Sequence, residues 1–313
     1  MIRVGAQYLG GSVSPKDFAV AVERAGFDSV WCGDHVGHYV DGISTLGCYA
    51  GCTEAIQIGA NVLVAPLRPA VVTAKAISTV ARLAGPRFVA GIGVGGDFAD
   101  EIEAVGADMA HRGAFTDELL AVLPLLLAGW PVDFDGRFTS LRGFRMDPQP
   151  ASLPPVWIGG RADAALRRAA RFGQGYLGYL LSPDGLAKRV ARLAELKADG
   201  DPPGTALQVA CNVFFVPART TEEAVDAVAT SGLAVQGLTG DMVRKVFLLG
   251  DDESCLARIR HYVDAGLEHL ILGCAPGGPD DLRSFLEATS RLLPEIRAMG
   301  GSAAGRRPHG ASG

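Results

Sequence analysis

The stretch Asp28-Ser29-Val30-Trp31-Cys32-Gly33-Asp34-His35 predicts a short buried strand that ends in a pair of polar side chains. Its apolar residues predict the strand, and Gly33 predicts the strand's end. Active sites of parallel α/β sheets and barrels lie at the carboxyl ends of the strands. An imidazole there, beside a group that can fix its tautomer, is typical of acid–base chemistry. An Asp-His pair can also cap a helix or a turn, so the pair alone leaves both interpretations open.

Short apolar runs alternate with amphipathic segments along the rest of the chain. The strand-like runs are Ile2–Ala6, Asp28–Cys32, Ile56–Val62, Phe88–Val94, Val156–Ile158, Gly175–Leu180, Leu207–Val216 and His269–Gly273. The helix-like stretches are Pro15–Ala25, Ala70–Leu83, Arg112–Ala128, Asp163–Phe172, Pro183–Ala198, Thr221–Ser231, Glu253–Ala265 and Asp280–Met299. Repeated alternation predicts a parallel sheet, and eight units favour a closed (β/α)8 TIM barrel of the α/β class over an open sheet.

Two stretches do not fit a plain barrel. Gly129–Pro155 is rich in Pro, Gly and Asp and carries several aromatic residues, which predicts one or two inserted β-hairpins. Gly232–Asp252 predicts a loop with a short helix, and long loops of this kind often cover a substrate. We therefore expect one barrel domain over residues 1–299, with the hairpin region 129–155 inserted, and a disordered tail over 300–313.

Composition narrows the class of protein. The net charge is −5 and no block of Lys or Arg is present, which argues against a nucleic-acid partner. The six cysteines form no CxxC pair and no Cys/His array, so we expect a reduced, cytoplasmic protein without a metal site. We expect no signal peptide, because the first strand begins at once, and no membrane span, because no apolar run approaches about 20 residues.

Two glycine-rich turns follow predicted strands. Gly91-Ile92-Gly93-Val94-Gly95-Gly96 formally matches the dinucleotide fingerprint GxGxxG. It follows the fourth strand rather than the first, so we expect only that its backbone can lie flat against a planar ligand, or that it is a tight turn. Pro155-Val156-Trp157-Ile158-Gly159-Gly160-Arg161-Ala162-Asp163 joins a strand to a helix. It predicts a phosphate site at the helix start, with a plain strand-to-helix turn as the alternative. Asn61, in an apolar run, should face the barrel mouth or be hydrogen-bonded.

These segments together resemble the bacterial luciferase-like family of flavin- and deazaflavin-dependent enzymes, over about residues 1–300 and in the same order. The resemblance rests on the following motifs: Trp31…Asp34-His35, Pro66-Leu67-Arg68-Pro69-Ala70-Val71-Val72…Ala74-Lys75, Gly91-Ile92-Gly93-Val94-Gly95, Glu101…Gly106, Arg112-Gly113…Asp117-Glu118, Asp135-Gly136-Arg137-Phe138, Pro155-Val156-Trp157-Ile158-Gly159-Gly160, Ala169-Ala170-Arg171-Phe172-Gly173 and Tyr262-Val263-Asp264-Ala265-Gly266. The chain is most similar to the branch of this family that uses coenzyme F-420.

The resemblance implies a fold, a cofactor and a set of site residues. It implies a (β/α)8 barrel, frequently a homodimer, with the isoalloxazine or deazaflavin ring in its mouth. Asp34 and His35 match the pair beside the ring, and the Asn61–Val62 bond matches a bulge with a non-prolyl cis peptide behind it. Val94, Gly95 and Gly96 match positions that line the ring. Ile158, Gly159, Gly160 and Arg161 match the loop that holds the phosphate.

The resemblance also implies a reaction. We expect hydride transfer between C5 of coenzyme F-420 and a small organic substrate, with His35 as general acid/base and Asp34 orienting it. The alternative is an FMN-dependent monooxygenase that uses oxygen, and flavin binding without turnover is a further rival. Sugar-phosphate dehydrogenases of this branch carry a catalytic Glu where this chain has Gly96, which argues against a sugar phosphate as substrate. Candidate substrate contacts, by loop position, are Tyr8, His38, Tyr39, Phe98 and Tyr179.

Overall fold

Parallel strands form a closed barrel at the centre of the computed structural model, which describes residues 1–198, 206–229, 238, 240–274 and 279–300. The eight barrel strands are β1 (Arg3–Tyr8), β2 (Ser29–Cys32), β3 (Gln57–Ala60), β5 (Phe88–Gly93), β8 (Val156–Gly159), β9 (Gly175–Tyr179), β10 (Gln208–Pro217) and β12 (His269–Cys274). They pair in the order β10-β12-β1-β2-β3-β5-β8-β9, and pairing of β9 with β10 closes the ring. The predicted strands and the predicted (β/α)8 fold are therefore confirmed.

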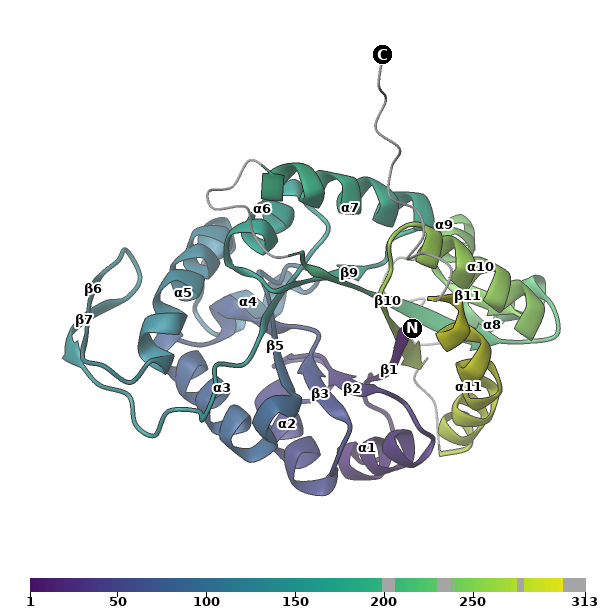
Figure 1. The fold of residues 1–313 in the computed structure, drawn as a ribbon, viewed down its shortest axis with the longest axis horizontal. Helices are drawn as coiled ribbons and strands as arrows, with labels where there is room; N and C mark the ends of the chain where they lie inside the picture. The colour runs from purple at the N-terminus through teal and green to yellow at the C-terminus, as the bar shows by residue number, and fades with distance from the viewer. Residues whose placement is uncertain (199–205, 230–237, 239, 275–278, 301–313) are drawn as a thin grey trace, which may run out of the picture.

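Short strands extend this framework. β4 (Leu63–Val64) pairs with β5, and β11 (Leu248–Gly250) pairs with β10. β6 (Val132–Asp135) and β7 (Ser140–Phe144) form one antiparallel hairpin in the region expected to hold one or two. In Figure 1 this hairpin projects from the ring of helices beside α5.

Helices surround the strands on the outside of the barrel, except for the short α4, which lies inside this ring (Figure 1). They are α1 (Pro15–Arg24), α2 (Gly42–Cys52), α3 (Ala70–Ala84), α4 (Ala99–Ala104), α5 (Arg112–Leu127), α6 (Asp163–Phe172), α7 (Pro183–Ala198), α8 (Thr221–Ala229), α9 (Gly240–Val246), α10 (Asp252–Asp264) and α11 (Pro279–Met299). Short 3₁₀ turns cover Ala65–Leu67, Gly85–Arg87 and Met109–His111. All the predicted helices are present, within a few residues at their ends, and α9 is the short helix expected between residues 232 and 252.

Two helices, α2 and α4, have no counterpart among the predicted helices. The α2 sequence carries three glycines, which are poor helix formers. Tertiary packing and capping make it a helix nonetheless: Leu46 and Tyr49 are fully buried, and the Asp41 side chain accepts a hydrogen bond from the Ser44 N–H at 2.7 Å. α4 is only six residues long, too short to show a hydrophobic period.

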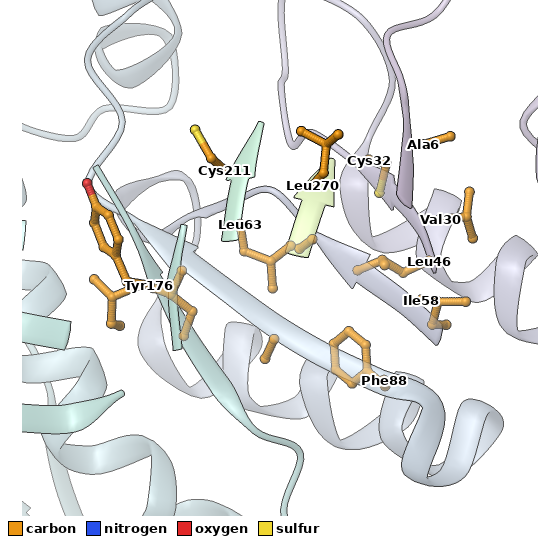
Figure 2. Close-up of a cluster of buried hydrophobic side chains, with 14 of the residues drawn as sticks. Ala6, Val30, Cys32, Leu46, Ile58, Leu63, Phe88, Tyr176, Cys211 and Leu270 are labelled. Atoms are coloured by element: carbon orange, nitrogen blue, oxygen red, sulfur yellow. The ribbon is translucent and has the colours of Figure 1, made fainter. Parts of the chain in front are cut away.

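The main apolar core lies between the barrel strands and the helices. Alternate strand residues such as Val30, Ile58 and Leu270 point outward into it, and Leu46 reaches it from α2 (Figure 2). This layer fixes the positions of the strands, and so of the loops that follow their carboxyl ends.

A second, smaller core fills the inside of the barrel. Trp31 and Trp157 are buried there, with ring centroids 5.5 Å apart. Neighbouring strands make room with glycine: a Cβ atom at Gly59 would lie 2.2 Å from Trp31, and one at Gly175 would lie 2.6 Å from Trp157. These side chains fill the amino-terminal part of the barrel among the described residues.

Several expectations concern features outside the barrel itself. No described helix is long and apolar enough to cross a membrane. The described residues hold no cluster of three or more potential metal ligands, and five cysteines among them are free thiols. Residues 301–313 of the expected tail, and residues 232–237 and 239 of the expected loop, lie outside the described residues.

Candidate active site

A cavity of about 400 Å³ opens at the carboxyl ends of the barrel strands. It falls within the range typical of small-molecule and cofactor sites. Most of the residues expected at the site line it: Tyr8, His35, Tyr39, Asn61, Val62, Val94, Gly95, Gly96, Phe98, Gly159, Gly160, Arg161 and Tyr179. Asp34, His38 and Ile158 do not line it.

His35 lies in the cavity wall with its ring held on several sides. The Nδ1 atom lies 2.9 Å from Oε2 of Glu101. Tyr39 and Phe98 pack edge-on against the imidazole, with centroids 5.1 and 5.2 Å away. The side chain is 19% exposed, and no described residue hydrogen-bonds Nε2. The ring is therefore fixed in orientation while one nitrogen remains available for a ligand.

Glu101, on α4, holds both His35 and the loop that follows it. Its Oε1 atom accepts hydrogen bonds from the N–H groups of Val36, Gly37 and His38, at 2.8 to 3.1 Å. Burial alone would raise the pKa of Glu101, but the hydrogen bonds from His35 and from these N–H groups together lower it. The carboxylate is consequently ionised at neutral pH and can only accept, so His35 Nδ1 carries the proton in this contact.

Asp34 does not orient His35, so that expectation is wrong. The Asp34 carboxylate is fully buried and forms a bidentate pair with Arg68, at 2.6 and 2.8 Å. It also accepts the N–H groups of Gly42 and Val64. Adjacent residues of an extended chain point to opposite sides, so Asp34 ties the loop after β2 to the segment after β3 while His35 faces the cavity.

The wall behind the cavity is formed by a bulge after β3. The peptide bond between Asn61 and Val62 is cis, which confirms that expectation. The Val62 side chain fits between two glycines: a Cβ atom at Gly93 or Gly159 would lie 2.5 or 2.6 Å from its methyl groups. Gly93 and Gly159 therefore create space for Val62, and Val62 presents an apolar surface to the cavity.

Amide side chains meet beside this bulge. Asn61 Nδ2 and Asn212 Nδ2 both donate to Gln7 Oε1, at 2.5 and 2.9 Å. Asn61 thus satisfies both alternatives, since it is hydrogen-bonded and also lines the cavity. The Oδ1 atom of the buried Asn212 has no hydrogen-bond partner among the described residues. Neither Gln7 nor Asn212 was singled out by the sequence.

The turn between β8 and α6 forms the opposite rim. Gly160 has a φ of +140°, and Ala162 caps α6 without a side-chain hydrogen bond, so the first N–H groups of this helix have no side-chain acceptor at the cap. Arg161 lies beside the cavity and pairs with Asp97 at 3.3 Å. Ile158 instead belongs to the outer core, because the alternation along β8 turns its side chain away from the barrel interior.

Of the five expected substrate contacts, four line the cavity and one does not. Tyr39, Phe98 and Tyr179 contribute aromatic surface to the cavity. Tyr8 lines the cavity, but its hydroxyl donates to the Val13 carbonyl at 2.6 Å and its ring packs against Phe18. His38 stacks on the Phe98 ring at 4.1 Å and lies outside the cavity lining, so the expectation of direct contact is corrected for His38.

Two charged residues of the site were missed as functional residues. Glu101 and Arg112 both occur in the motifs that carry the resemblance, but neither was assigned a role. Glu101 is 66 residues from His35 in the chain, and only folding shows that they meet. The signal that could have pointed to it is its place in the Glu101…Gly106 motif, just after the glycine-rich turn at Gly91–Gly96.

Comparison with known proteins gives consistent matches. Residues 14–236 match the family model described as luciferase-like monooxygenase. A curated F-420-dependent glucose-6-phosphate dehydrogenase from Beutenbergia cavernae is 30% identical, over 95% of this chain and 98% of that protein. One from Mycobacterium avium is 29% identical, over 96% and 99%.

Solved structures share the fold. An F-420-dependent secondary alcohol dehydrogenase, in complex with an F-420–acetone adduct, superposes with a TM-score of 0.84 at 18% identity, over 95% of this chain and 99% of that one. A monooxygenase from Streptomyces bottropensis superposes with a TM-score of 0.80 at 17% identity, over 94% and 99%. At such identities the superpositions support the fold alone.

Proposed function

Because this chain belongs to the luciferase-like monooxygenase family, we propose that it is an oxidoreductase that uses coenzyme F-420 as its hydride carrier. The substrate is a small organic molecule. The observation that carries this proposal is His35, whose Nδ1 is fixed by Glu101 while Nε2 faces the cavity without a described partner. Curated relatives of 29–30% identity carry F-420 dependence in their names and match almost the whole chain.

The residues present fit such a cofactor. A planar ring needs a flat, partly apolar wall, and Val62 with the backbone of Val94, Gly95 and Gly96 offers one. Gly95 has no room for a side chain of its own, since a Cβ atom there would lie 2.6 Å from Val64, so its bare backbone forms this part of the wall. Gly160 and Arg161, at the start of α6, would hold the phosphate through backbone N–H groups and a guanidinium.

His35 is the acid–base group in this proposal. When bound, the deazaflavin supplies a hydride acceptor or donor at C5. As an alcohol is oxidised, its carbon gives up a hydride, its hydroxyl proton passes to His35 Nε2, and a C=O bond forms. In the reverse direction His35 returns that proton to the carbonyl oxygen. Glu101 holds the proton of the neutral ring on Nδ1, so that Nε2 is the free base. Its carboxylate also stabilises the imidazolium that forms when Nε2 takes up the substrate proton.

Two further properties belong to the same proposal. We expect a homodimer, as the family resemblance implies. We also expect a cytoplasmic enzyme, because the free thiols of Cys32, Cys48, Cys52, Cys211 and Cys255 suit a reducing compartment.

Paired fluorescence titrations test the cofactor. We expect micromolar binding of oxidised F-420 to the purified protein and much weaker binding of FMN. Tighter binding of FMN would overturn the proposal and direct attention to oxygen consumption with a flavin reductase.

A panel of alcohols and carbonyl compounds, with glucose 6-phosphate included, would then be screened by the change in F-420 absorbance. Turnover that disappears in His35→Ala, while F-420 still binds, is the expected result. Unchanged turnover in that variant would remove His35 from the mechanism.

A further inference from the structure

Arg112 places a guanidinium in the cavity wall without a carboxylate partner. It is the first residue of α5 and lines the cavity. Its Nη1 atom donates to the Met109 carbonyl at 2.6 Å. Its Nε atom is buried and has no hydrogen-bond partner, and no carboxylate of the described residues forms an ion pair with it. The Arg112 side chain is half-buried, and a buried N–H group without an acceptor is unfavourable, so this arrangement suits an acceptor from outside the chain.

The acidic groups nearby are already engaged elsewhere. Asp97, next to Gly96 in the chain, pairs with Arg161 at 3.3 Å. Glu101 pairs with His35, and Asp117 of α5 pairs with Arg168 at 2.7 Å. Asp108, four residues before Arg112, pairs with His111 at 2.6 Å, so none of these acids forms an ion pair with Arg112.

The Nε and Nη2 edge of Arg112 lies beside Gly96, a position that has no side chain. A Cβ atom at Gly96 would lie 3.5 Å from Nε and 3.9 Å from Nη2 of Arg112. The φ of +123° at Gly96 is one that residues with side chains rarely adopt, so the backbone itself favours keeping this space open. The edge formed by Nε and Nη2 presents two parallel N–H groups, which match the two oxygens of a carboxylate.

The cavity wall next to Gly96 is apolar at Gly95. The side chains of Val64 and Ile102 reach Gly95, where a Cβ atom would lie 2.6 and 3.2 Å from them. Phe98 also lines the cavity. A ligand whose anionic end lies on Arg112 would thus place its body against apolar side chains, which favours an organic acid over a sugar.

We propose that Arg112 is a substrate-binding residue that recognises the carboxylate of an organic acid with an apolar body. Its role in substrate choice rests on the proposed function, whereas the anion site itself can be tested without turnover. The cofactor and a phosphate ester also carry oxyanions, so the experiment separates these sources.

Calorimetric titration of the full-length protein, both free and saturated with F-420, tests the proposal. The probes are benzoate, the uncharged benzamide of the same shape, and inorganic phosphate. We expect benzoate to bind and benzamide not to bind. Arg112→Met should weaken benzoate binding about 10- to 100-fold, the usual range for charged hydrogen bonds. Arg112→Lys should recover only part of it, because a single ammonium lacks the paired edge. Arg142→Met, on the exposed hairpin strand β7, is the control: it removes the same charge away from the cavity and should leave benzoate binding unchanged. Thermal melting checks the folding of each variant.

Three other outcomes overturn the assignment, and a fourth separates it from the cofactor proposal. Stronger binding of phosphate than of benzoate, lost in Arg112→Met, would make this a phosphate site. If the wild type does not bind benzoate and Arg112→Met binds F-420 more weakly, Arg112 contacts the cofactor and not the substrate. Benzoate binding that survives Arg112→Met would exclude Arg112. If benzoate binds through Arg112 but F-420 does not bind at all, the cofactor proposal fails and the anion site stands.

Discussion

His35 Nδ1 and Glu101 Oε2 lie 2.9 Å apart, and this contact joins the loop after β2 to the helix after β5. The same carboxylate binds three consecutive N–H groups of that loop. One buried side chain thus fixes both the tautomer of the imidazole and the backbone on which it stands. We regard Glu101 as the positioning residue for His35.

Glu101→Gln should lower turnover by about 10²-fold or more while F-420 still binds. The amide oxygen can still accept the loop N–H groups, but the amide nitrogen would then donate to Nδ1 and favour the opposite tautomer, with the proton on Nε2. Nitrogen NMR of the His35 ring would report this change directly, and a purely structural role would not produce it. Glu103→Gln, an exposed position on the same helix, is the control. A fall in turnover with an unaltered tautomer would contradict the positioning role.

Arg68→Met should destabilise the fold by about 3–5 kcal/mol, because it leaves the buried Asp34 carboxylate without its partner. Urea unfolding measures the loss. Arg219→Met removes an ion pair whose guanidinium side is 89% exposed, and should change stability by less than about 1 kcal/mol. Equal effects in the two variants would show that the contact between Asp34 and Arg68 is not structural.

Gly159→Ala should weaken F-420 binding about tenfold, since the added methyl group would overlap Val62 and push it into the cavity. The double variant Gly159→Ala with Val62→Ala removes that overlap and should regain most of the affinity. Gly47→Ala, with no atom within 4 Å of the added carbon, is the control. Failure of the second substitution to restore binding would mean that Val62 does not shape the ring site.

The buried His269 should make the fold sensitive to acid. Burial lowers its pKa to about 3, and its Nε2 lies 2.7 Å from the Ser29 hydroxyl at the amino-terminal end of the barrel. The unfolded chain takes up this proton near pH 6.5, the folded protein only near pH 3, so stability is full above pH 6.5 and declines between these values.

The expected slope is about 1.4 kcal/mol per pH unit over that window, in addition to the contributions of other groups. Urea midpoints measured between pH 7 and pH 4 should therefore fall less steeply in His269→Gln than in the wild type. Identical slopes would show that His269 is not held neutral.

Much of the fold could be predicted because hydrophobic period and turn residues are local properties. The barrel strands were found from their apolar runs, and helices such as α7 were found at their observed bounds. α2 was missed because its glycines oppose helix formation, and burial of Leu46 and Tyr49 overrides that preference. The bulge between Asn61 and Val62 followed only from family resemblance, since nothing local in the sequence requires a cis bond there.

The sequence by itself determined that polar residues follow the strands, and hence that His35, Asn61 and the glycine-rich turns share one edge of a barrel. Tertiary structure alone decided which charged groups form ion pairs. Arg68 pairs with Asp34 and Glu101 pairs with His35, whereas Arg112 has no carboxylate partner among the described residues. Period and composition act over a few residues, whereas ion pairing depends on distances between segments far apart in the chain, which the closed sheet fixes.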